Sequence, residues 1–226
     1  MVIINRERKK TGSRASILVR MILLLALVQV ARAMLNRWMQ SNAWDTQVLY
    51  TAAEALVLTV IGTMLFALAR LAHIRLGALP AITSSKDRIL YIAATVITVL
   101  LLLQVPLKTR DFSLPTLLAF SYTAVVLPVF EEILFRGYVW SRLRTQFVPE
   151  VTVCMVSAVL YGVWEAGYLD LLLAGGSLTA AGVVMSLITN MVFGLILGLI
   201  TGLARLISKN YYPSILIHIV LSMVLR

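Results

Sequence analysis

Charged residues are scarce in this sequence. Only 13% of its 226 residues are Asp, Glu, Lys or Arg, whereas about 25% is usual for a soluble domain. Apolar residues make up 60% of the chain, and the mean hydropathy is +0.92. This composition excludes an ordinary soluble protein and predicts an integral membrane protein. The length fits one helical bundle and leaves no room for a separate soluble domain.

Cysteine is nearly absent as well. The single Cys154 excludes an intramolecular disulfide and any cysteine-based metal cluster. Acidic residues number 10 against 20 basic ones, so the net charge is +10. The basic residues gather at the ends of apolar runs, as they do in the cytoplasmic loops of membrane proteins. We therefore expect membrane lipids, not nucleic acid, as the partners of this charge.

The apolar runs predict an all-α fold, a polytopic membrane helix bundle with about seven transmembrane helices. A basic cytoplasmic tail is expected at 1–14, followed by the transmembrane bundle at 15–226. The first span carries Arg20 and Arg32, which are expected to snorkel to the membrane surface; an interfacial helix is the alternative for this segment. The predicted spans are 17–35, 48–71, 89–107, 112–130 with a helical continuation to about 144, 151–168, 178–206, and 213 to the C-terminus.

Basic residues also predict the topology. The positive-inside rule places the N-terminus and the loops 73–88, 141–150 and 205–210 in the cytoplasm. The protein is thus expected to be a multi-pass protein of the cell membrane with a cytoplasmic N-terminus. Glycines recur every four residues in the sixth span and predict a close approach of a neighbouring helix. These are Gly194, Gly198 and Gly202, and Gly175-Gly176 is expected to form the turn before that span.

Three ionisable residues lie together inside the fourth apolar run: Glu131, Glu132 and Arg136. Ionisable groups inside a membrane are costly and often mark function. Glu132 and Arg136 are four residues apart, so they share a helix face and can pair. Glu131 is rotated about 100° away, so it is left to face another element and can serve as a general base.

Two other spans carry polar pairs with the same spacing. Tyr161 and Glu165 lie one turn apart in the fifth span, and His218 and Ser222 lie one turn apart in the last. Each of these groups would cost several kcal/mol if it stayed unpaired in the membrane. We therefore predict that the polar groups of the three spans satisfy each other around one aqueous cavity.

In order, these motifs are Glu131-Glu132-x-x-x-Arg136, then Tyr161-x-x-x-Glu165, then His218-x-x-x-Ser222. The series resembles the CAAX protease and bacteriocin-processing (Abi) family of intramembrane glutamate proteases. That family's pattern is Glu-Glu-x-x-x-Arg, Phe-x-x-x-His and His-x-x-x-Asn. The resemblance covers about residues 88–226, the expected family-like core.

The resemblance implies a role for each matching position. Glu131 would activate a water, with Glu132, Arg136 and Tyr161 in support. His218 and Ser222 would form the oxyanion pocket. No cofactor and no metal is expected, although Glu131, Glu165 and His218 would suit zinc by ligand type.

The sequence departs from the family pattern at three positions. Tyr161 replaces phenylalanine, Ser222 replaces asparagine, and Glu165 replaces the histidine of the second motif. Two nearby carboxylates can share one proton, as in an aspartic-protease dyad. Glu165 is therefore expected to share or shuttle a proton with Glu131. Alternatively, loss of the histidine ends peptide cleavage.

The function expected from these residues is intramembrane hydrolysis of a membrane-associated or lipidated peptide by a glutamate-activated water. The first rival is a non-catalytic member of the family that acts as a membrane scaffold or immunity protein. A second is a small transporter that uses the carboxylates as a proton relay. No inverted repeat is evident in the sequence, which counts against the transporter.

Overall fold

The computed structural model describes residues 13–41, 47–71, 85–168 and 179–225, and these segments contain helices and no strands. The fourth predicted span is one continuous helix, Leu114–Leu143, which we call the central helix. The elements are α1 (Arg14–Ser41), α2 (Gln47–Leu71), α3 (Ser85–Thr109), the central helix as α4 (Leu114–Ser121), η1 (Tyr122–Val126), α5 (Leu127–Glu132), η2 (Ile133–Val139) and α6 (Trp140–Leu143), then α7 (Glu150–Ala166), α9 (Ala180–Ser208) and α10 (Tyr212–Leu225).

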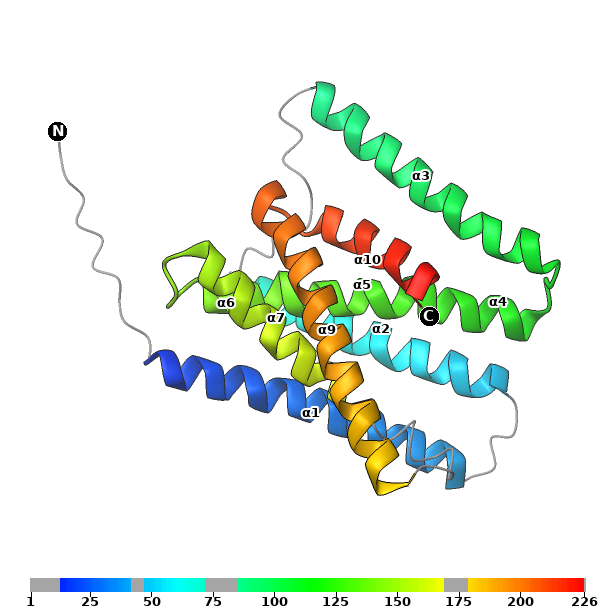
Figure 1. Ribbon diagram of the computed structural model, residues 1–226, viewed down its shortest axis with the longest axis horizontal. Coiled ribbons are helices and arrows are strands. Elements are labelled where there is room, and N and C mark those ends of the chain that lie inside the picture. The colour runs from blue at the N-terminus through cyan, green and yellow to red at the C-terminus, as the bar shows by residue number, and fades with distance from the viewer. Residues whose placement is uncertain (1–12, 42–46, 72–84, 169–178, 226) are drawn as a thin grey trace.

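The described helices confirm the all-α membrane bundle. Five of them are long and apolar enough to cross a membrane by length and composition: α1, α2, α3, the central helix and α9. The other two, α7 and α10, are shorter, with 17 and 14 residues. In Figure 1 the central helix runs through the middle of the bundle, α10 lies between it and α3, and α9 crosses α7. The protein is thus a multi-pass membrane protein.

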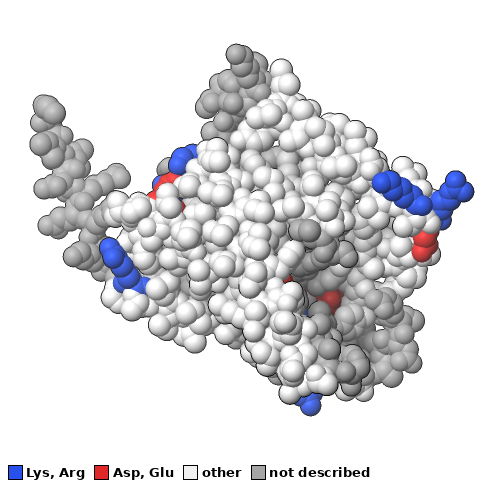
Figure 2. Space-filling model, in the orientation of Figure 1, with Lys and Arg blue, Asp and Glu red and all other residues white. Residues whose placement is uncertain are grey.

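The outer surface of the bundle is apolar. Large hydrophobic side chains point outward from the long helices, for example Leu27 at 66%, Leu68 at 54% and Ile89 at 68% exposure. Figure 2 shows that Lys, Arg, Asp and Glu side chains gather at the ends of the helices and leave the middle of this face almost uncharged. Such a surface suits the hydrocarbon layer of a bilayer, which is ~30 Å thick.

Several predicted cytoplasmic segments meet at one end of the bundle. Glu150, at the start of α7, pairs with Arg144 at 3.1 Å and with Lys209 at 2.6 Å. Arg14, at the start of α1, stacks on Phe147 with its guanidinium carbon 5.7 Å from the ring centroid. The start of α1 and the loops 141–150 and 205–210 therefore share one face of the membrane. Most of the tail 1–14 and of the loop 73–88, and all of the Gly175-Gly176 turn, fall outside the described residues.

The helices α7 and α9 pack closely because glycines line their contact. A Cβ added at Gly198 would lie 3.0 Å from Ala158 Cα, and one at Gly202 would lie 2.8 Å from Cys154 Sγ. A Cβ at Gly162 of α7 would lie 2.9 Å from the carbonyl oxygen of Met191. The predicted approach of a neighbouring helix to the glycine stripe is thus confirmed, and the partner is α7.

The central helix contains two π-helical segments, η1 and η2, which lie on either side of α5. Widened turns of this kind are rare and frequently occur at functional sites. The short α5 between them ends in Glu131 and Glu132. The continuous helix was predicted from the sequence, whereas its π-helical turns were not.

Candidate active site

Glu131 and Glu132 are completely buried in the middle of the bundle, and so is Arg136, one turn further along the central helix. A charged group without a partner would be very costly in such a position. Each carboxylate is therefore expected to have polar or charged groups around it.

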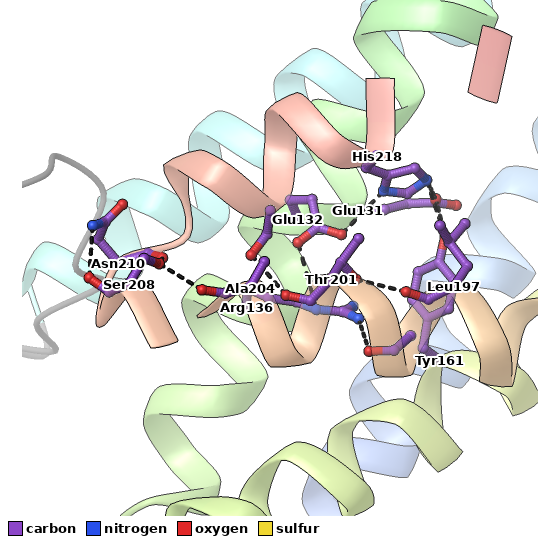
Figure 3. A network of polar contacts seen from close by, with 12 residues as sticks. Glu131, Glu132, Arg136, Tyr161, Leu197, Thr201, Ala204, Ser208, Asn210 and His218 are labelled. Atoms are coloured by element: carbon purple, nitrogen blue, oxygen red, sulfur yellow. Dashed lines mark hydrogen bonds and ion pairs between the residues drawn. The ribbon is translucent and has the colours of Figure 1, made fainter. Parts of the chain in front are cut away.

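Glu132 lies between a guanidinium and an imidazole. Arg136 Nε is 3.5 Å from Glu132 Oε2, and His218 Nδ1 is 3.0 Å from Glu132 Oε1. Arg136 is itself held from the next helix, because its Nη2 donates a hydrogen bond to the carbonyl oxygen of Gly198 at 2.5 Å. The structure thus brings together the Glu132–Arg136 pair that the spacing predicts, and it adds His218 (Figure 3).

Glu131 accepts hydrogen bonds from three aromatic side chains of α7 and its C-terminal end. Tyr161 donates to Oε2 at 2.5 Å, Trp164 Nε1 donates to Oε1 at 2.9 Å, and Tyr168 donates to Oε1 at 2.8 Å. Residues with the spacing i, i+3 and i+7 share one helix face. Sequence reasoning missed Trp164 and Tyr168. The signal that could have identified them is the i, i+3, i+7 spacing of three aromatic side chains with N–H or O–H donors.

His218 contacts both carboxylates through its two ring nitrogens. Its Nε2 is 3.6 Å from Glu131 Oε2 and 3.4 Å from the Tyr161 hydroxyl, while Nδ1 faces Glu132. An imidazolium here would balance the cluster, because two carboxylates would then face two cations, Arg136 and His218. Such pairing is the condition under which buried charges are tolerated. His218 is held in place from α10, where Ser214 Oγ donates to the carbonyl oxygen of Thr201 on α9 at 2.8 Å.

Glu165 lies on the same helix as the three aromatic donors but packs toward α9. It is 5% exposed, and a Cβ added at Gly194 would lie 2.5 Å from its Cγ. The described hydrogen bonds and ion pairs of Glu131 run to Tyr161, Trp164, Tyr168 and His218. The sharing of a proton between Glu131 and Glu165 therefore stays a prediction.

Ser222 follows His218 by one turn of α10 and is 7% exposed. Within the described part of the chain its Oγ has no hydrogen-bond partner. A buried hydroxyl without a partner is unusual in folded proteins. Its predicted place in an oxyanion pocket stays a prediction too.

Arg32 does not snorkel, and this corrects the expectation from the sequence. It is 1% exposed, and its guanidinium carbon lies 4.5 Å from the centroid of the Tyr168 ring. Its Nη2 donates to the carbonyl oxygen of Gly167 at 2.9 Å, and its Nε donates to Gln29 Oε1 at 2.8 Å. Arg32 stays inside because the C-terminal end of α7 offers it an aromatic face and a carbonyl oxygen. It thereby braces Tyr168, which holds Glu131.

Among the described residues, no three His, Cys, Asp or Glu side chains lie close enough together to hold a metal ion. Glu131, Glu165 and His218, which suit zinc by ligand type, are not arranged as such a set. The donor groups around Glu131 are instead two phenols and an indole N–H.

A cavity of about 360 Å³ reaches the neighbourhood of the site from the side of α2. Phe130 and Ile133, the residues that flank the Glu131–Glu132 pair, form part of its wall. Across it, a Cβ added at Gly62 would lie 3.3 Å from Phe130 Cδ2, and the Phe130 ring also lies 6.3 Å from the Trp164 ring. Phe130 thus separates this apolar cavity from the donors of Glu131.

Comparisons with known proteins agree with the motifs. A family model described as "Type II CAAX prenyl endopeptidase Rce1-like" matches residues 113–224. The match begins at the start of the central helix and ends within α10, so it includes the described hydrogen-bond and ion-pair partners of Glu131 and Glu132. No curated protein and no solved structure gives a match.

Proposed function

Because the chain belongs to the Rce1-like family of CAAX-type intramembrane proteases, we propose that it is an endopeptidase that cleaves a membrane-associated or lipidated peptide with a glutamate-activated water. The observation that carries the proposal is the meeting of three helices inside the membrane. The central helix supplies Glu131 and Glu132, α7 supplies the groups around Glu131, and α10 supplies His218, which contacts both carboxylates.

Each group has a part in the proposed reaction. Glu131 removes a proton from water, and the water oxygen bonds to the carbonyl carbon of the substrate. The negative charge that develops on the carbonyl oxygen is stabilised by hydrogen bonds from His218 and Ser222. The carbon–nitrogen bond then breaks, and the leaving amine receives a proton through Glu165 or Glu131. The products are a new carboxyl terminus and a new amine.

Glu132 and Arg136 act through His218 in this scheme. Nδ1 of His218 faces Glu132 at 3.0 Å, which leaves Nε2 directed at Glu131 and the reacting oxygen atoms. Arg136 offsets the charge of Glu132 at 3.5 Å. Removing either residue would turn the imidazole or leave a buried charge without a partner.

A substrate has to open the site, since Glu131 and His218 are both completely buried. The apolar cavity beside α2 offers a way in, because Phe130 in its wall is next to Glu131. Movement of the Phe130 ring away from Trp164 would join the cavity to the carboxylate. This route suits a substrate that arrives from the lipid phase.

The test is cleavage of a reporter library of membrane peptides by the purified protein. The variant Glu131→Gln removes the base, and we expect its rate to fall at least about 100-fold, since a positioned base contributes about 10²–10⁴-fold. The matched control is Glu150→Gln, which changes a partly exposed carboxylate at the end of the bundle and should leave the rate unchanged. Equal rates for Glu131→Gln and the native protein would rule out the proposed mechanism.

The second candidate is a non-catalytic scaffold or immunity protein. It is favoured by the surroundings of Glu131, whose oxygens already accept three hydrogen bonds. These donors occupy lone pairs through which Glu131 would have to take the proton from water. Absence of cleavage by the native protein across the library would support this candidate.

A further inference from the structure

The end of the bundle where basic residues gather contains a second cavity, between α1 and α6. It measures about 490 Å³, and α1 lines it with Arg20 and the apolar Ile17, Met21 and Leu24. Tyr138, Arg142 and Thr145 complete the lining. This is within the range of about 300–1,000 Å³ that small-molecule sites occupy. The groups of the candidate active site form no part of its lining, so this cavity needs its own explanation.

Within the part of the chain that the structure describes, the two arginines in this cavity have no carboxylate partner. Among the described residues, Arg144 and Lys209 pair with Glu150, and Arg136 pairs with Glu132. No such pair is described for Arg20 or Arg142. The Arg142 guanidinium lies over the Tyr138 ring, 5.5 Å from its centroid, and this stacking leaves its N–H donors available. The described lining of the cavity thus contains two positive charges and no negative one.

The position of Arg20 corresponds to the headgroup level of a bilayer. With 28 residues, α1 is about 42 Å long at 1.5 Å per residue, whereas the hydrocarbon layer measures about 30 Å. Each end of α1 therefore extends roughly 6 Å beyond that layer. Arg20 follows Arg14 by six residues, or about 9 Å, so it lies near the boundary between headgroups and hydrocarbon. Met21 and Leu24 follow Arg20 on α1 and extend the apolar lining of the cavity toward the hydrocarbon.

We propose that this cavity binds the phosphate-bearing headgroup of an anionic membrane lipid. Two guanidinium groups suit the oxygens of a phosphodiester, because each offers several donors in a fixed plane. Ile17, Met21 and Leu24 then contact the first part of the acyl chains. Basic pockets between membrane helices are a known form of lipid recognition. A soluble phosphate compound would use the arginines but gain nothing from the apolar side.

The experiment measures lipid retention by the full-length protein in a neutral detergent with native mass spectrometry. The protein receives either phosphatidylglycerol or phosphatidylcholine with the same acyl chains. The test variant is Arg20→Gln/Arg142→Gln. The control variant Arg37→Gln/Lys108→Gln removes the same amount of charge from exposed positions at the other end of the bundle. A conservative variant, Arg20→Lys/Arg142→Lys, keeps the charge of the site.

The native protein and the control should retain phosphatidylglycerol in preference to phosphatidylcholine. The test variant should bind it about 20- to 30-fold more weakly, since each cation near the surface contributes about fivefold, and the lysine variant should bind it more tightly than the glutamine variant. Equal retention of the two lipids, or an unchanged affinity in the glutamine variant, would overturn the proposal. A parallel thermal-shift series with inorganic phosphate at constant ionic strength separates the sources. Stabilisation by phosphate without a preference for phosphatidylglycerol would assign the cavity to a soluble phosphate compound instead.

Discussion

Arg136 lowers the free-energy cost of burying Glu131 and Glu132 side by side in the membrane. Its side chain has no exposed surface, and it connects Glu132 on its own helix with the backbone of α9. His218 supplies a second group that faces both carboxylates. A change at any one of these residues leaves a buried charge uncompensated, which typically costs about 3–5 kcal/mol. The charged residues of the site are therefore also required for its stability.

Glu165 is the residue whose role distinguishes a proton-sharing pair of carboxylates from a lost catalytic histidine. We expect Glu165→His to shift the pH–rate profile by more than about one pH unit, because free carboxyl and imidazole groups titrate near 4.3 and 6.5. The rate of peptide cleavage from pH 4 to pH 9 checks this. A higher cleavage rate with an unchanged pH optimum would contradict the proton-sharing role. Glu165→Gln is the control, because an amide cannot exchange a proton in this pH range.

The sequence predicted which residues would meet but not the details of their contacts. Glu131, Glu132 and His218 could be placed together because unpaired polar groups in the membrane are too costly. The three donors of Glu131 depend on the rotation of α7, which close packing against α9 determines. Arg32 was expected at the membrane surface because snorkelling is the usual solution for a single arginine. Its buried position depends on contacts with Tyr168 and Gly167, which only the folded chain provides.

At the scale of elements, the contact between α7 and α9 fixes the orientation of the groups around Glu131. Gly162 lies one residue after Tyr161, and a Cβ there would meet the backbone of α9, 2.9 Å from the Met191 carbonyl oxygen. We expect Gly162→Ala to destabilise the protein by about 1–3 kcal/mol, the usual cost of overpacking. Unfolding in detergent, followed by circular dichroism, measures the change.

Gly62→Ala is the matched control for this prediction. A Cβ at Gly62 would lie 3.3 Å from the end of the Phe130 ring, which faces a cavity and can move. We expect a change well below that of Gly162→Ala. Equal effects of the two substitutions would show that backbone contact between α7 and α9 is not what holds the site.

A second link between elements joins the ends of α6, α7 and α9 through Glu150. The hydrogen bond from Lys209, followed by the charge of Arg144, lowers the pKa of the Glu150 carboxyl from its ordinary value of 4.5. The folded state therefore gains stability from this group above pH 4.5 and loses it as the pH falls through the lower folded pKa. The three side chains are partly exposed, so the gain is at most about 1 kcal/mol.

The measurement compares the native protein with Glu150→Gln by thermal unfolding in detergent between pH 7 and pH 3. The melting temperature of the native protein should be the higher one at neutral pH. This difference should then shrink below pH 4.5. A constant difference across the series would mean that the ion pairs contribute no pH-dependent stability.

Most elements, but not their internal irregularities, could be predicted from the sequence. Long apolar runs predicted each of the helices that the structure describes, counting the central helix as one, with boundaries that differ by a few residues. The reason is that the length of a span is set by the membrane. The π-helical turns on either side of α5 leave no such signal in the composition. They widen the helix next to Glu131 and Glu132, and they depend on packing with neighbouring helices.

At the scale of the whole molecule, the contacts between helices sort the described segments into two ends of the bundle. Ser13, Phe147 and Lys209 lie at one end, as the contacts of Arg14 and Glu150 show, and Ser113 lies at the other, before the central helix. The positive-inside rule assigns the first end to the cytoplasm. This orientation would place the proposed lipid cavity in the cytoplasmic leaflet, where anionic lipids give the surface a negative potential.

Cysteine labelling in intact cells tests this orientation, since the native Cys154 is only 2% exposed and provides an unreactive background. A membrane-impermeant maleimide should label Ser113→Cys in intact cells. It should label Ser13→Cys and Lys209→Cys only after the membrane is permeabilised, because the positive-inside rule predicts that both positions face the cytoplasm. Labelling of Ser13→Cys and Lys209→Cys from outside, with Ser113→Cys protected, would reverse the orientation and move the basic end of the bundle to the outer face. Labelling of Ser13→Cys and Lys209→Cys from different sides would contradict the bundle itself. The Arg14–Phe147 contact places the start of α1 beside the loop 141–150, and Glu150 pairs with Lys209, so these segments must share one face.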